Sequence, residues 1–519
     1  MTITNRLGHT RDLLAAMTRA GLIAPLRPDR YLRIAAAARR EGATETLGFA
    51  IAAQRCPDRA GLIDELGTLT WRQLEERIDA LAAALQSLPG LTALDQSDAR
   101  RNPRTIGIMC RNHRGFVQAL VAAHRVGADA VLLNTAFAGP ALADVVNREG
   151  VDMVIYDEEF TRGIDQALTG APDVTRILAW TDDPSPADEL TVENLINANL
   201  GRRPTRAGSG KLIMLTSGTT GAPKGAKRSG GGIDALLAIL RATPWRAEQT
   251  TVVVAPMFHA WGFSQLVFSA MMACTVVTRR KFDPEATLAL IDRYRATGLG
   301  VVPVMIDRIM ALPQHVRARY DCRSLRFAAA SGSRMRPDAV LAFMDEFGDV
   351  IYNNYNGTEV GMVATATPAD LRAAPDTAGR PVEGAEVRIL DDQRDELPTG
   401  EVGQIFVRNT TRFEGYTSGA TKESHDGFMA TGDLGYLDEA GRLFVVSRDD
   451  EMIVSGGENV YPIEVEKTLT AHPDVAEAAV IGVDDDQFGQ RLAAFAVLLP
   501  LIENDQCCSS KVTTLACSG

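Results

Sequence analysis

Apolar positions along the chain follow two spacings, one typical of buried strands and one typical of amphipathic helices. Leu74, Ile78 and Leu81 recur at helical spacing, directly after Thr70 and Gln73, which match a helix-capping box. Short apolar runs such as TIGIMC, DAVLLN and DMVIYD alternate with helical patterns and predict strands. This order predicts an α/β fold in which helices cover doubly wound, mostly parallel sheets.

The pattern changes near residue 380, where short strand-like runs and turns replace the longer alternation. The runs AEVRIL and GQIFVR predict a small β-barrel-like part, and Asp438 to Gly441 is a hairpin turn signal. A helix beginning near Pro462 and two apolar strands then predict a small α/β domain. We therefore expect a large domain over residues 1–447 and a small C-terminal domain over residues 448–519.

Composition narrows the class of protein. The chain has 519 residues, of which 45% are hydrophobic and 23% charged, as in soluble globular proteins. A net charge of -12 disfavours a general nucleic-acid binder, which needs a basic surface.

Residues 250–278 contain no Asp, Glu, Lys or Arg and are long enough for a membrane span. Pro256, His259 and Gly262 interrupt them, so we expect a strand, a loop, a helix and a second strand there.

The N-terminus and the cysteines bear on location. The first 45 residues carry eight arginines against four acidic residues, and contain no apolar signal core. They predict either helices docked on the protein surface or a peripheral contact with a membrane. None of the seven cysteines forms a CxxC pair, which favours free thiols in a reducing, cytoplasmic setting.

The stretch LIMLTSGTTGAPKGAKR, residues 212–228, joins an apolar strand to a loop suited to a polyphosphate. Glycines let the backbone approach an anion closely, and hydroxyl groups and a lysine add donors and charge. The glycines are Gly218, Gly221 and Gly225, and the other polar members are Thr216, Ser217, Thr219, Thr220 and Lys224. A glycine-rich turn without a ligand is the simpler alternative. The Walker pattern is absent, because Lys224 follows Pro223 and precedes Gly225.

This stretch resembles the phosphate loop of the adenylate-forming enzymes, a family that includes acyl-CoA synthetases, luciferase and the adenylation domains of peptide synthetases. Two further segments are similar to that family. YNNYNGTEVG, residues 352–361, resembles its adenine-binding segment, and residues 431–466 resemble its ribose-binding, hinge and domain-crossing region. The resemblance covers roughly residues 45 to 500, and the three segments stand in the family's order.

The resemblance implies ATP, Mg²⁺ and coenzyme A as cosubstrates and cofactor. A carboxylate attacks the α-phosphate of ATP to give an acyl-adenylate, and a thiol then takes the acyl group. The residues implied to bind nucleotide or coenzyme A are Thr216, Ser217, Gly218, Thr219, Thr220, Gly221, Lys224, Ser331, Gly332, Asn354, Tyr355, Gly357, Thr358, Asp433, Arg448, Ser455, Gly456 and Gly457. The small domain is implied to be mobile about a hinge at Asp450.

Catalytic roles carried over from the family fall on Lys224, His259, Thr358 and Glu359. Glu359 would hold Mg²⁺ together with Thr216, and His259 would contact or gate the carboxylate substrate. Each has a simpler interpretation: a lone histidine is more often structural, and a lone glutamate is more often a surface acid. The same holds for Tyr355, implied to stack on adenine, which could be a core aromatic.

The acid itself is the least defined part. The segments expected around it are largely apolar and offer neither a cation for an amino acid's carboxylate nor an acid for its amine: HAWGFSQ, PVMIDRI, AAASGSRM and YNGTEVGM. We therefore expect a medium- or long-chain fatty acid, converted to its CoA thioester. The alternatives are an acyl-AMP ligase that loads a carrier protein, a luciferase-like oxygenase, and a non-catalytic adenylate- or acyl-binding protein.

The end of the chain departs from the family pattern. The family has a late lysine after Thr-Gly, whereas neither Lys467 nor Lys511 stands in that setting. Residues 501–519 also lack arginine and contain three cysteines. We expect a small domain that is incomplete, with adenylation impaired more than thioester formation. The alternative is a natural end in which Lys511 takes over the role.

Overall fold

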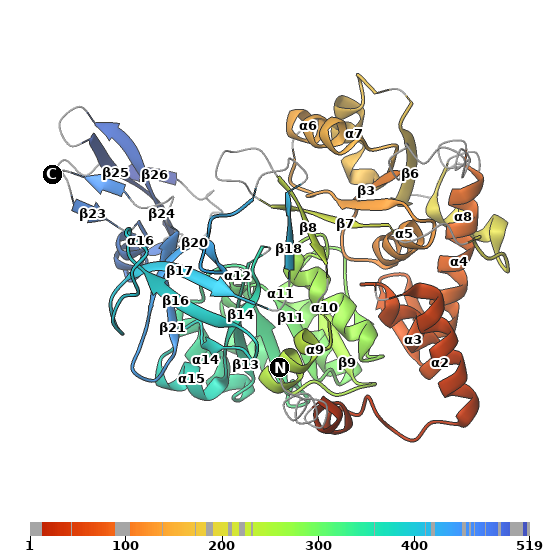
Figure 1. Cartoon of the computed structure of the whole chain (residues 1–519), viewed down its shortest axis with the longest axis horizontal. Helices are drawn as coiled ribbons and strands as arrows, with labels where there is room; N and C mark the ends of the chain where they lie inside the picture. The colour runs from red at the N-terminus through yellow and green to blue at the C-terminus, as the bar shows by residue number, and fades with distance from the viewer. Residues whose placement is uncertain are drawn as a thin grey trace. The chain divides into compact units, whose positions relative to one another are not determined.

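The computed structural model is shown in Figure 1. It describes residues 13–42, 44–88, 104–137, 139–171, 173–182, 190–205, 210–216, 224–229, 232–357, 359–409, 412–416, 421–448, 453–455, 458–460, 462–472, 474–485, 489–498 and 512–515. The chain divides into two compact units. The first comprises residues 1–376, 382–384 and 409–421, and the second comprises residues 377–381, 385–408 and 422–519.

The first unit contains a seven-stranded sheet in the order β18-β8-β7-β4-β3-β5-β6. Strands β3 to β7 are parallel neighbours, and β8 and β18 add an antiparallel edge. The strands are β3 (Thr105–Met109), β4 (Asp129–Leu132), β5 (Met153–Asp157), β6 (Thr175–Trp180), β7 (Leu212–Thr216), β8 (Lys224–Ser229) and β18 (Arg412–Tyr416). The helical segments between them are α5 (Arg114–Arg125), α6 (Gly139–Glu149), η1 (Glu158–Phe160), α7 (Thr161–Ala167) and α8 (Val192–Asn199).

A second sheet of the same unit runs in the order β14-β13-β12-β11-β9-β10-β1-β2, with β2 and β14 antiparallel to their neighbours. Its strands are β1 (Ala60–Asp64), β2 (Gly67–Thr70), β9 (Thr250–Val253), β10 (Thr275–Val277), β11 (Gly298–Val301), β12 (Phe327–Ala330), β13 (Ile351–Gly357) and β14 (Gly361–Ala366). The remaining helices of the unit are α2 (Pro28–Glu41), α3 (Leu47–Arg55), α4 (Trp71–Ser87), α9 (Gly232–Ala242), α10 (Ala260–Met271), α11 (Pro284–Tyr294), α12 (Pro303–Met310), α13 (Gln314–Arg317), α14 (Pro337–Phe347) and α15 (Pro368–Ala373).

Both faces of the first sheet are covered, which explains why its central strands β3, β4 and β5 are apolar and buried along almost their whole length. In β3, Ile106 and Ile108 pack into a cluster with α4 and α5, whereas Met109 faces a cluster with α6 and α7. Figure 1 shows α6 and α7 on one side of β3 and α5 on the other. The cluster of α4 and α5 also includes Val253 of β9 and Leu266 of α10, so the two sheets share an inner layer of helices. The predicted doubly wound architecture is confirmed.

Local sequence signals are also confirmed. Helix α4 begins with the predicted capping box, because Gln73 N donates to Thr70 Oγ1 at 3.1 Å and Thr70 N donates to Gln73 Oε1 at 2.9 Å. Residues 250–278 form β9, α10 and β10 in the predicted order. Among the described residues, no helix is both long and apolar enough to cross a membrane.

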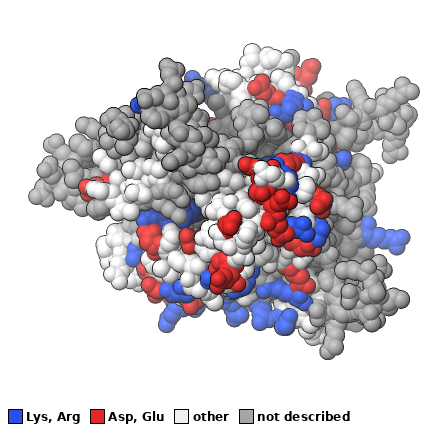
Figure 2. Space-filling view, turned by 60° about the vertical axis from the view of Figure 1, so that its left-hand side comes forward, with Lys and Arg blue, Asp and Glu red and all other residues white. Residues whose placement is uncertain are grey.

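The second unit begins with short strands that form an antiparallel sheet, β16-β17-β20-β19, with β21 paired to β20. The strands of this sheet are β16 (Glu386–Leu390), β17 (Gly403–Arg408), β19 (Ser424–His425), β20 (Phe428–Leu437) and β21 (Leu443–Arg448), and the short strand β15 (Arg380–Pro381) precedes them in the chain without belonging to the sheet. The predicted turn joins β20 to β21, with Gly441 N donating to Asp438 O at 2.9 Å. Within this sheet Arg394 pairs with Glu423, and Arg408 pairs with Glu386. On the face of the molecule shown in Figure 2, basic and acidic side chains likewise lie next to one another.

The rest of the second unit is a sheet in the order β23-β22-β25-β24, with β26 paired to β25. Its elements are β22 (Ile453–Ser455), β23 (Glu458–Val460), α16 (Pro462–Thr470), β24 (Val475–Asp485), β25 (Gly489–Leu498) and β26 (Val512–Leu515). Helix α16 is tied to β24, because Val480 N donates to Glu466 Oε1 at 2.8 Å. The expected domain boundary between residues 447 and 448 stays a prediction.

Candidate active site

Four neighbouring parallel strands bring the predicted acid-site segments to one edge of their sheet. Strands β13, β12, β11 and β9 lie side by side and parallel, so their carboxyl ends meet at the same edge. The segments that follow them are the four expected around the acid, and they carry His259 after β9, Pro303 after β11, Ser331 after β12 and Glu359 after β13. In open α/β sheets this edge is where ligands bind.

The ends of β12 and β13 are joined by side-chain contacts. Asn356 Nδ2 donates to Ser331 Oγ at 3.1 Å, and Ser331 is buried. Asn354 is turned into the sheet, where it donates to Ala330 O and accepts from Thr365 Oγ1 at 3.0 Å. The structure thus brings Ser331 next to the predicted adenine-binding segment. Asn356 was not among the predicted residues. Its position two residues after Asn354 on the same strand could have indicated it, because such residues point to the same side of a sheet.

Two predicted positions in this region depend on backbone geometry. Gly332 has a φ of 106°, a conformation in which a side chain would be strained. Gly357 ends β13, where a Cβ would lie 2.6 Å from the Val360 side chain. Tyr355, also on β13, is partly buried and pairs in register with Ala364. Glycine is therefore required by the turn at Gly332 for a local reason, independent of any ligand.

His259 caps the beginning of α10. Its backbone N donates to Pro256 O at 3.1 Å, and its ring packs on Phe258 with ring centroids 4.4 Å apart. The residue is exposed, yet desolvation by the surrounding chain lowers the pKa of its imidazole. The lowered pKa favours the neutral ring, in which one nitrogen donates and the other accepts hydrogen bonds.

The chain after His259 is packed tightly against neighbouring strands. Trp261 Nε1 donates to Val301 O at 2.7 Å, which ties α10 to the end of β11. A Cβ at Gly262 would lie 2.2 Å from Pro256 O, so only glycine fits there. Trp261 and Tyr352 both pack, partly buried, against the cluster around Phe268. Trp261 therefore brings an aromatic ring to the carboxyl end of β11.

The predicted phosphate loop is the tip of a hairpin between β7 and β8. Thr216 and Lys224 are directly paired across the hairpin, so the backbone brings these two predicted residues together. The tip itself lies outside the described residues, and with it the predicted Ser217, Gly218, Thr219, Thr220 and Gly221. Their roles stay predictions.

The predicted magnesium ligands are a hydroxyl and a carboxylate, which are hard oxygen donors of the kind that Mg²⁺ prefers. Glu359 lies two residues after the end of β13 and is partly buried, at the sheet edge described above. Thr358 lies outside the described residues. The donor chemistry of this edge therefore fits a magnesium ion bound together with nucleotide phosphates.

The predicted ribose ligands belong to the second unit, where they are neighbours. Asp433 and Arg448 are paired in register between β20 and β21, with Arg448 Nε 4.0 Å from Asp433 Oδ1. Asp433 N donates to Thr431 Oγ1, and Lys422 Nζ donates to Thr431 O at 3.3 Å. Asp433 lines a pocket of about 170 Å³ whose other lining residues are Gln404, Ile405, Lys422, Glu423, Ala430 and Gly432.

Two more predictions fall near the end of the chain. Ser455 is the last residue of β22, paired with both Glu458 of β23 and Gly489 of β25. The hinge residue Asp450 and the glycines Gly456 and Gly457 lie outside the described residues. Their roles in hinge motion and in the path of the thiol stay predictions.

Comparison with known proteins covers both units. The family model described as AMP-binding enzyme matches residues 49–417, and the model of the AMP-binding enzyme C-terminal domain matches residues 464–513. The chain is 31% identical over 444 residues to indoleacetate–CoA ligase of Aromatoleum aromaticum, covering 83% of each chain. It is 30% identical over 448 residues to 2-succinylbenzoate–CoA ligase of Bacillus pumilus, covering 85% of each.

Solved structures of a CoA ligase are also similar to this chain. The o-succinylbenzoate CoA synthetase of Bacillus subtilis, in complex with its acyl-adenylate intermediate, aligns with a TM-score of 0.71 and 25% identity over 88% of this chain and 89% of that one. The same synthetase has been solved with ATP and a magnesium ion, at 26% identity and a TM-score of 0.70. The chain belongs to the AMP-binding, adenylate-forming enzymes, whose CoA ligases use ATP to join an acid to coenzyme A through an acyl-adenylate.

Proposed function

We propose that this protein activates a carboxylic acid that carries an aromatic or fused ring, and transfers the acyl group to coenzyme A. Support for the ring comes from the similar ligases, whose names specify succinylbenzoate, indoleacetate and ferulate. A further relative, from Mycobacterium tuberculosis, acts on a propanoyl group attached to a bicyclic ring. This proposal replaces the sequence-based expectation of a medium- or long-chain fatty acid, which the names of these relatives do not specify.

The observation that carries the proposal is the single sheet edge at which His259, Ser331 and Glu359 follow adjacent strands. Phe258 and Trp261 flank His259 there. Aromatic side chains favour planar ring systems through stacked or edge-to-face contacts, which add to the burial of apolar surface. A planar acid entering this edge would have its ring among aromatic groups and its carboxylate near a neutral imidazole.

Several residues of the site act in the first half-reaction, in which the acyl-adenylate forms. Lys224 counters the charge of the leaving pyrophosphate, and the neutral His259 donates one hydrogen bond that orients the attacking carboxylate. Thr216 and Glu359 would hold Mg²⁺, which when bound neutralises charge on the phosphates. Asp433, with two carboxylate oxygens, accepts hydrogen bonds from the two ribose hydroxyls.

The test is a set of paired assays on one preparation. The first follows pyrophosphate release with ATP, Mg²⁺ and equal concentrations of benzoate, cinnamate, indoleacetate, octanoate and palmitate. We expect kcat/KM at least tenfold higher for an aryl acid than for either aliphatic acid, which corresponds to about 1.4 kcal/mol or more. Faster turnover of octanoate or palmitate would contradict the ring proposal and restore the fatty-acid expectation.

A second assay supplies synthetic acyl-adenylate with coenzyme A and follows the thioester. Comparison of the two assays also shows whether adenylation is weaker than thioester formation. Loss of pyrophosphate release in Glu359→Gln, with release retained in the exposed Glu401→Gln, would support the magnesium role. ATP binding without pyrophosphate release from any acid would favour the non-catalytic alternative.

A cytoplasmic location with peripheral membrane contact is also part of the proposal. Cys56, Cys110, Cys274 and Cys322 are free and buried, which suits a reducing compartment. On α2, Leu32 is 74% exposed next to the basic Arg33, as a membrane-facing helix would require. Sedimentation with anionic vesicles, compared between wild type and Leu32→Ser, tests the contact. Equal sedimentation would leave helix docking as the explanation.

A further inference from the structure

We propose that Asn112 is a positioning residue for the segment that carries His259, and that the buried pair of His113 and Asp157 holds Asn112 in place. The proposal rests on the proposed function, because it assumes that His259 meets the acid. Asn112 lies in the turn between β3 and α5, in the other sheet from the one that bears His259.

The side-chain amide of Asn112 grips the backbone just before His259. Its Nδ2 donates to Ala255 O at 2.8 Å, and its Oδ1 accepts from Met257 N at 2.8 Å. Asn112 is only 4% exposed, so both bonds are shielded from water. One amide thus replaces the partners that an adjoining strand would supply, and it fixes residues 255–257 relative to β3.

The other contacts of this loop leave it little freedom. Ala255 N donates to Gly300 O at 3.0 Å, and His259 N donates to Pro256 O. The backbone at Gly262 packs so closely on Pro256 that a Cβ would clash. Residues 255–262 are therefore held on both sides, and among the described residues Asn112 is their side-chain anchor from the opposite sheet.

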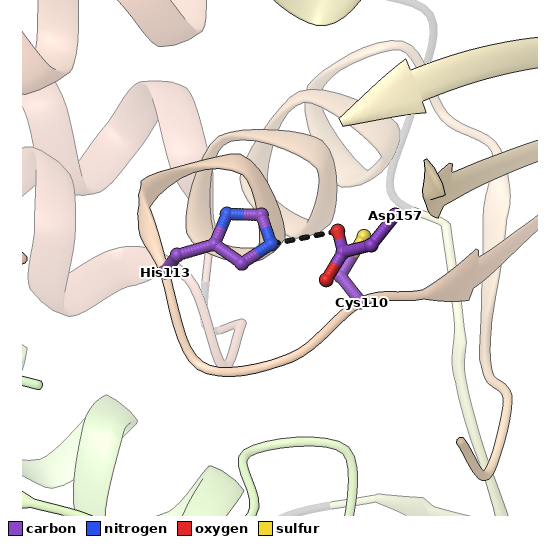
Figure 3. A group of neighbouring side chains, drawn as sticks. All are labelled: Cys110, His113 and Asp157. Carbon is purple, nitrogen blue, oxygen red and sulfur yellow. Dashed lines mark hydrogen bonds and ion pairs between the residues drawn. The ribbon is translucent and has the colours of Figure 1, made fainter. Parts of the chain in front are cut away.

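Asn112 is itself flanked by anchored residues, and Figure 3 shows one of them, His113, with its partner Asp157. His113 Nε2 lies 2.7 Å from Asp157 Oδ1, and both side chains are fully buried. The second oxygen, Asp157 Oδ2, accepts from Arg111 N at 2.9 Å. One carboxylate at the end of β5 therefore holds the residues on either side of Asn112.

The same group of side chains invites a metal-site interpretation, because ligand atoms of Cys110, His113 and Asp157 all lie within 4.8 Å of one another. The hydrogen bonds argue against it. His113 Nδ1 accepts from Gly115 N at 3.0 Å, so the ring proton is on Nε2 and is donated to Asp157. His113 therefore has no free lone pair for a metal, and burial raises the pKa of Cys110, which keeps it a thiol. The cluster positions the chain.

Without the amide, Ala255 O and Met257 N would be buried without partners, a state that backbone groups avoid by moving. The loop would shift towards water and carry His259 with it. Misplacement of about 1 Å at a reacting group can cost roughly 100-fold in rate. Asn112 thus acts on the acid through His259, without touching the acid.

The first experiment compares Asn112→Ala with a matched control, Thr275→Val. Thr275 is equally buried and its Oγ1 donates to Ala60 O at 2.7 Å, but at the amino end of β10, away from the site edge. Hydrogen exchange is followed by mass spectrometry in peptides spanning residues 254–262. We expect exchange at least tenfold faster in Asn112→Ala and unchanged in Thr275→Val. Equal exchange in all three proteins would overturn the proposal.

The second experiment is a double-mutant cycle on pyrophosphate release. We expect Asn112→Ala to raise KM for the acid about tenfold while leaving KM for ATP unchanged. In a His259→Ala background, the same substitution should then change kcat/KM by less than twofold, because the two residues act through one loop. A full effect in both backgrounds would mean a general structural role and would overturn the proposal.

Two provisions keep the outcomes distinct. If Asn112→Ala does not fold, Asn112→Asp retains the shape and the acceptor for Met257 and replaces the donor to Ala255 O with a carboxylate oxygen, so the exchange test proceeds with it. If no acid supports pyrophosphate release, the proposed function fails, while the exchange result still decides whether Asn112 positions the loop.

Discussion

The two ends of helix α5 are both buried and polar, yet they are built from different interactions. At its beginning, His113, Asp157 and Asn112 make directed hydrogen bonds in which an uncharged imidazole or amide takes part. At its end, Arg125 meets several carboxylates: its Nη2 lies 2.7 Å from Glu75, and its Nη1 lies 2.6 Å from Asp79. The first end leads to the site edge and the second leads to the N-terminal helix α2.

The charged end is an attachment. Arg40, near the end of α2, donates to Glu75 at 2.7 Å, and Glu41 lies 3.4 Å from Arg125 Nε. Burial alone would lower the pKa of Arg125, but the surrounding carboxylates overcome this and raise it. A pocket of about 130 Å³ opens here, lined by Arg40, Glu41, Asp79, His124, Arg125, Arg203 and Pro204.

The difference follows from what each end must do. A hydrogen bond to a backbone group has narrow limits of distance and angle, so it fixes where a loop lies. An ion pair tolerates variation in geometry but becomes costly when one buried partner is lost. Positioning near the site therefore uses amide and imidazole groups, and holding α2 in place uses charge. The predictions below separate these two roles.

The largest effect on stability is expected for Arg125→Met. The substitution removes the buried cation that Glu41, Glu75 and Asp79 share, and leaves them only the more exposed Arg40 and Arg203, which should cost about 3–5 kcal/mol of unfolding free energy. The kcat and KM of the folded fraction should not change, since α5 keeps its beginning. Urea unfolding with parallel kinetics checks this, and the exposed Arg162→Met should stay within about 0.5 kcal/mol. A drop in kcat/KM of the folded protein would contradict the view that the end of α5 only holds α2 in place.

A somewhat smaller loss is expected for Gly262→Ala, on the positioning side. The new Cβ would lie 2.2 Å from Pro256 O, and backbone cannot yield as a side chain does, so we expect about 1–3 kcal/mol of destabilisation. Here kcat/KM for the acid should fall as well, because the segment before His259 must shift. Gly163→Ala on α7, which meets open space, should instead stabilise by roughly 0.5–1 kcal/mol. Unchanged kinetics in Gly262→Ala would show that the loop tolerates displacement.

Asp157→Asn should have a similar or smaller effect by a different route. The carboxylate receives one N–H from His113 and one from Arg111, and an amide has only one oxygen, so one donor is left facing an NH₂ group. We expect a loss of about 1–3 kcal/mol, measured by thermal and urea unfolding. Asp152 directly precedes β5, and its side chain is 30% exposed. Asp152→Asn should therefore cost less than about 1 kcal/mol, because water can reach that side chain. Equal losses would contradict the importance of burial.

The smallest effect is a pH dependence at the charged end. Burial lowers the pKa of His124, which is 9% exposed beside Arg125. Below about pH 6.5 the unfolded chain binds a proton that the folded protein does not, so stability should fall as the pH drops. His124→Gln should make the unfolding free energy depend less steeply on pH between pH 7.5 and 5.5. The contribution of His259, whose pKa is also lowered, should remain in that variant. An unchanged slope would mean that His124 does not contribute.

Much of the fold follows from local patterns. Alternation of apolar runs predicted the strands β3, β4 and β5 and their covering helices, because burial on both faces requires apolar residues throughout. Thr70 and Gln73 predicted where α4 begins, and Asp438 to Gly441 predicted a hairpin, because capping and turns depend on a few consecutive residues. Motif spacing also located His259, Ser331 and Glu359 after the strands that bear them.

Other parts depended on tertiary structure. Asn112 and Ala255 are 143 residues apart, and a single asparagine after a strand looks like any loop residue. The same holds for Asn356 and Ser331, which meet because β12 and β13 are neighbours. A periodic pattern records which face of an element is buried, whereas the partner of one polar side chain is set by how distant elements pack. The sequence by itself therefore determined the elements, their order and the family's motifs, and only the tertiary structure decided which polar groups join the two sheets at the site.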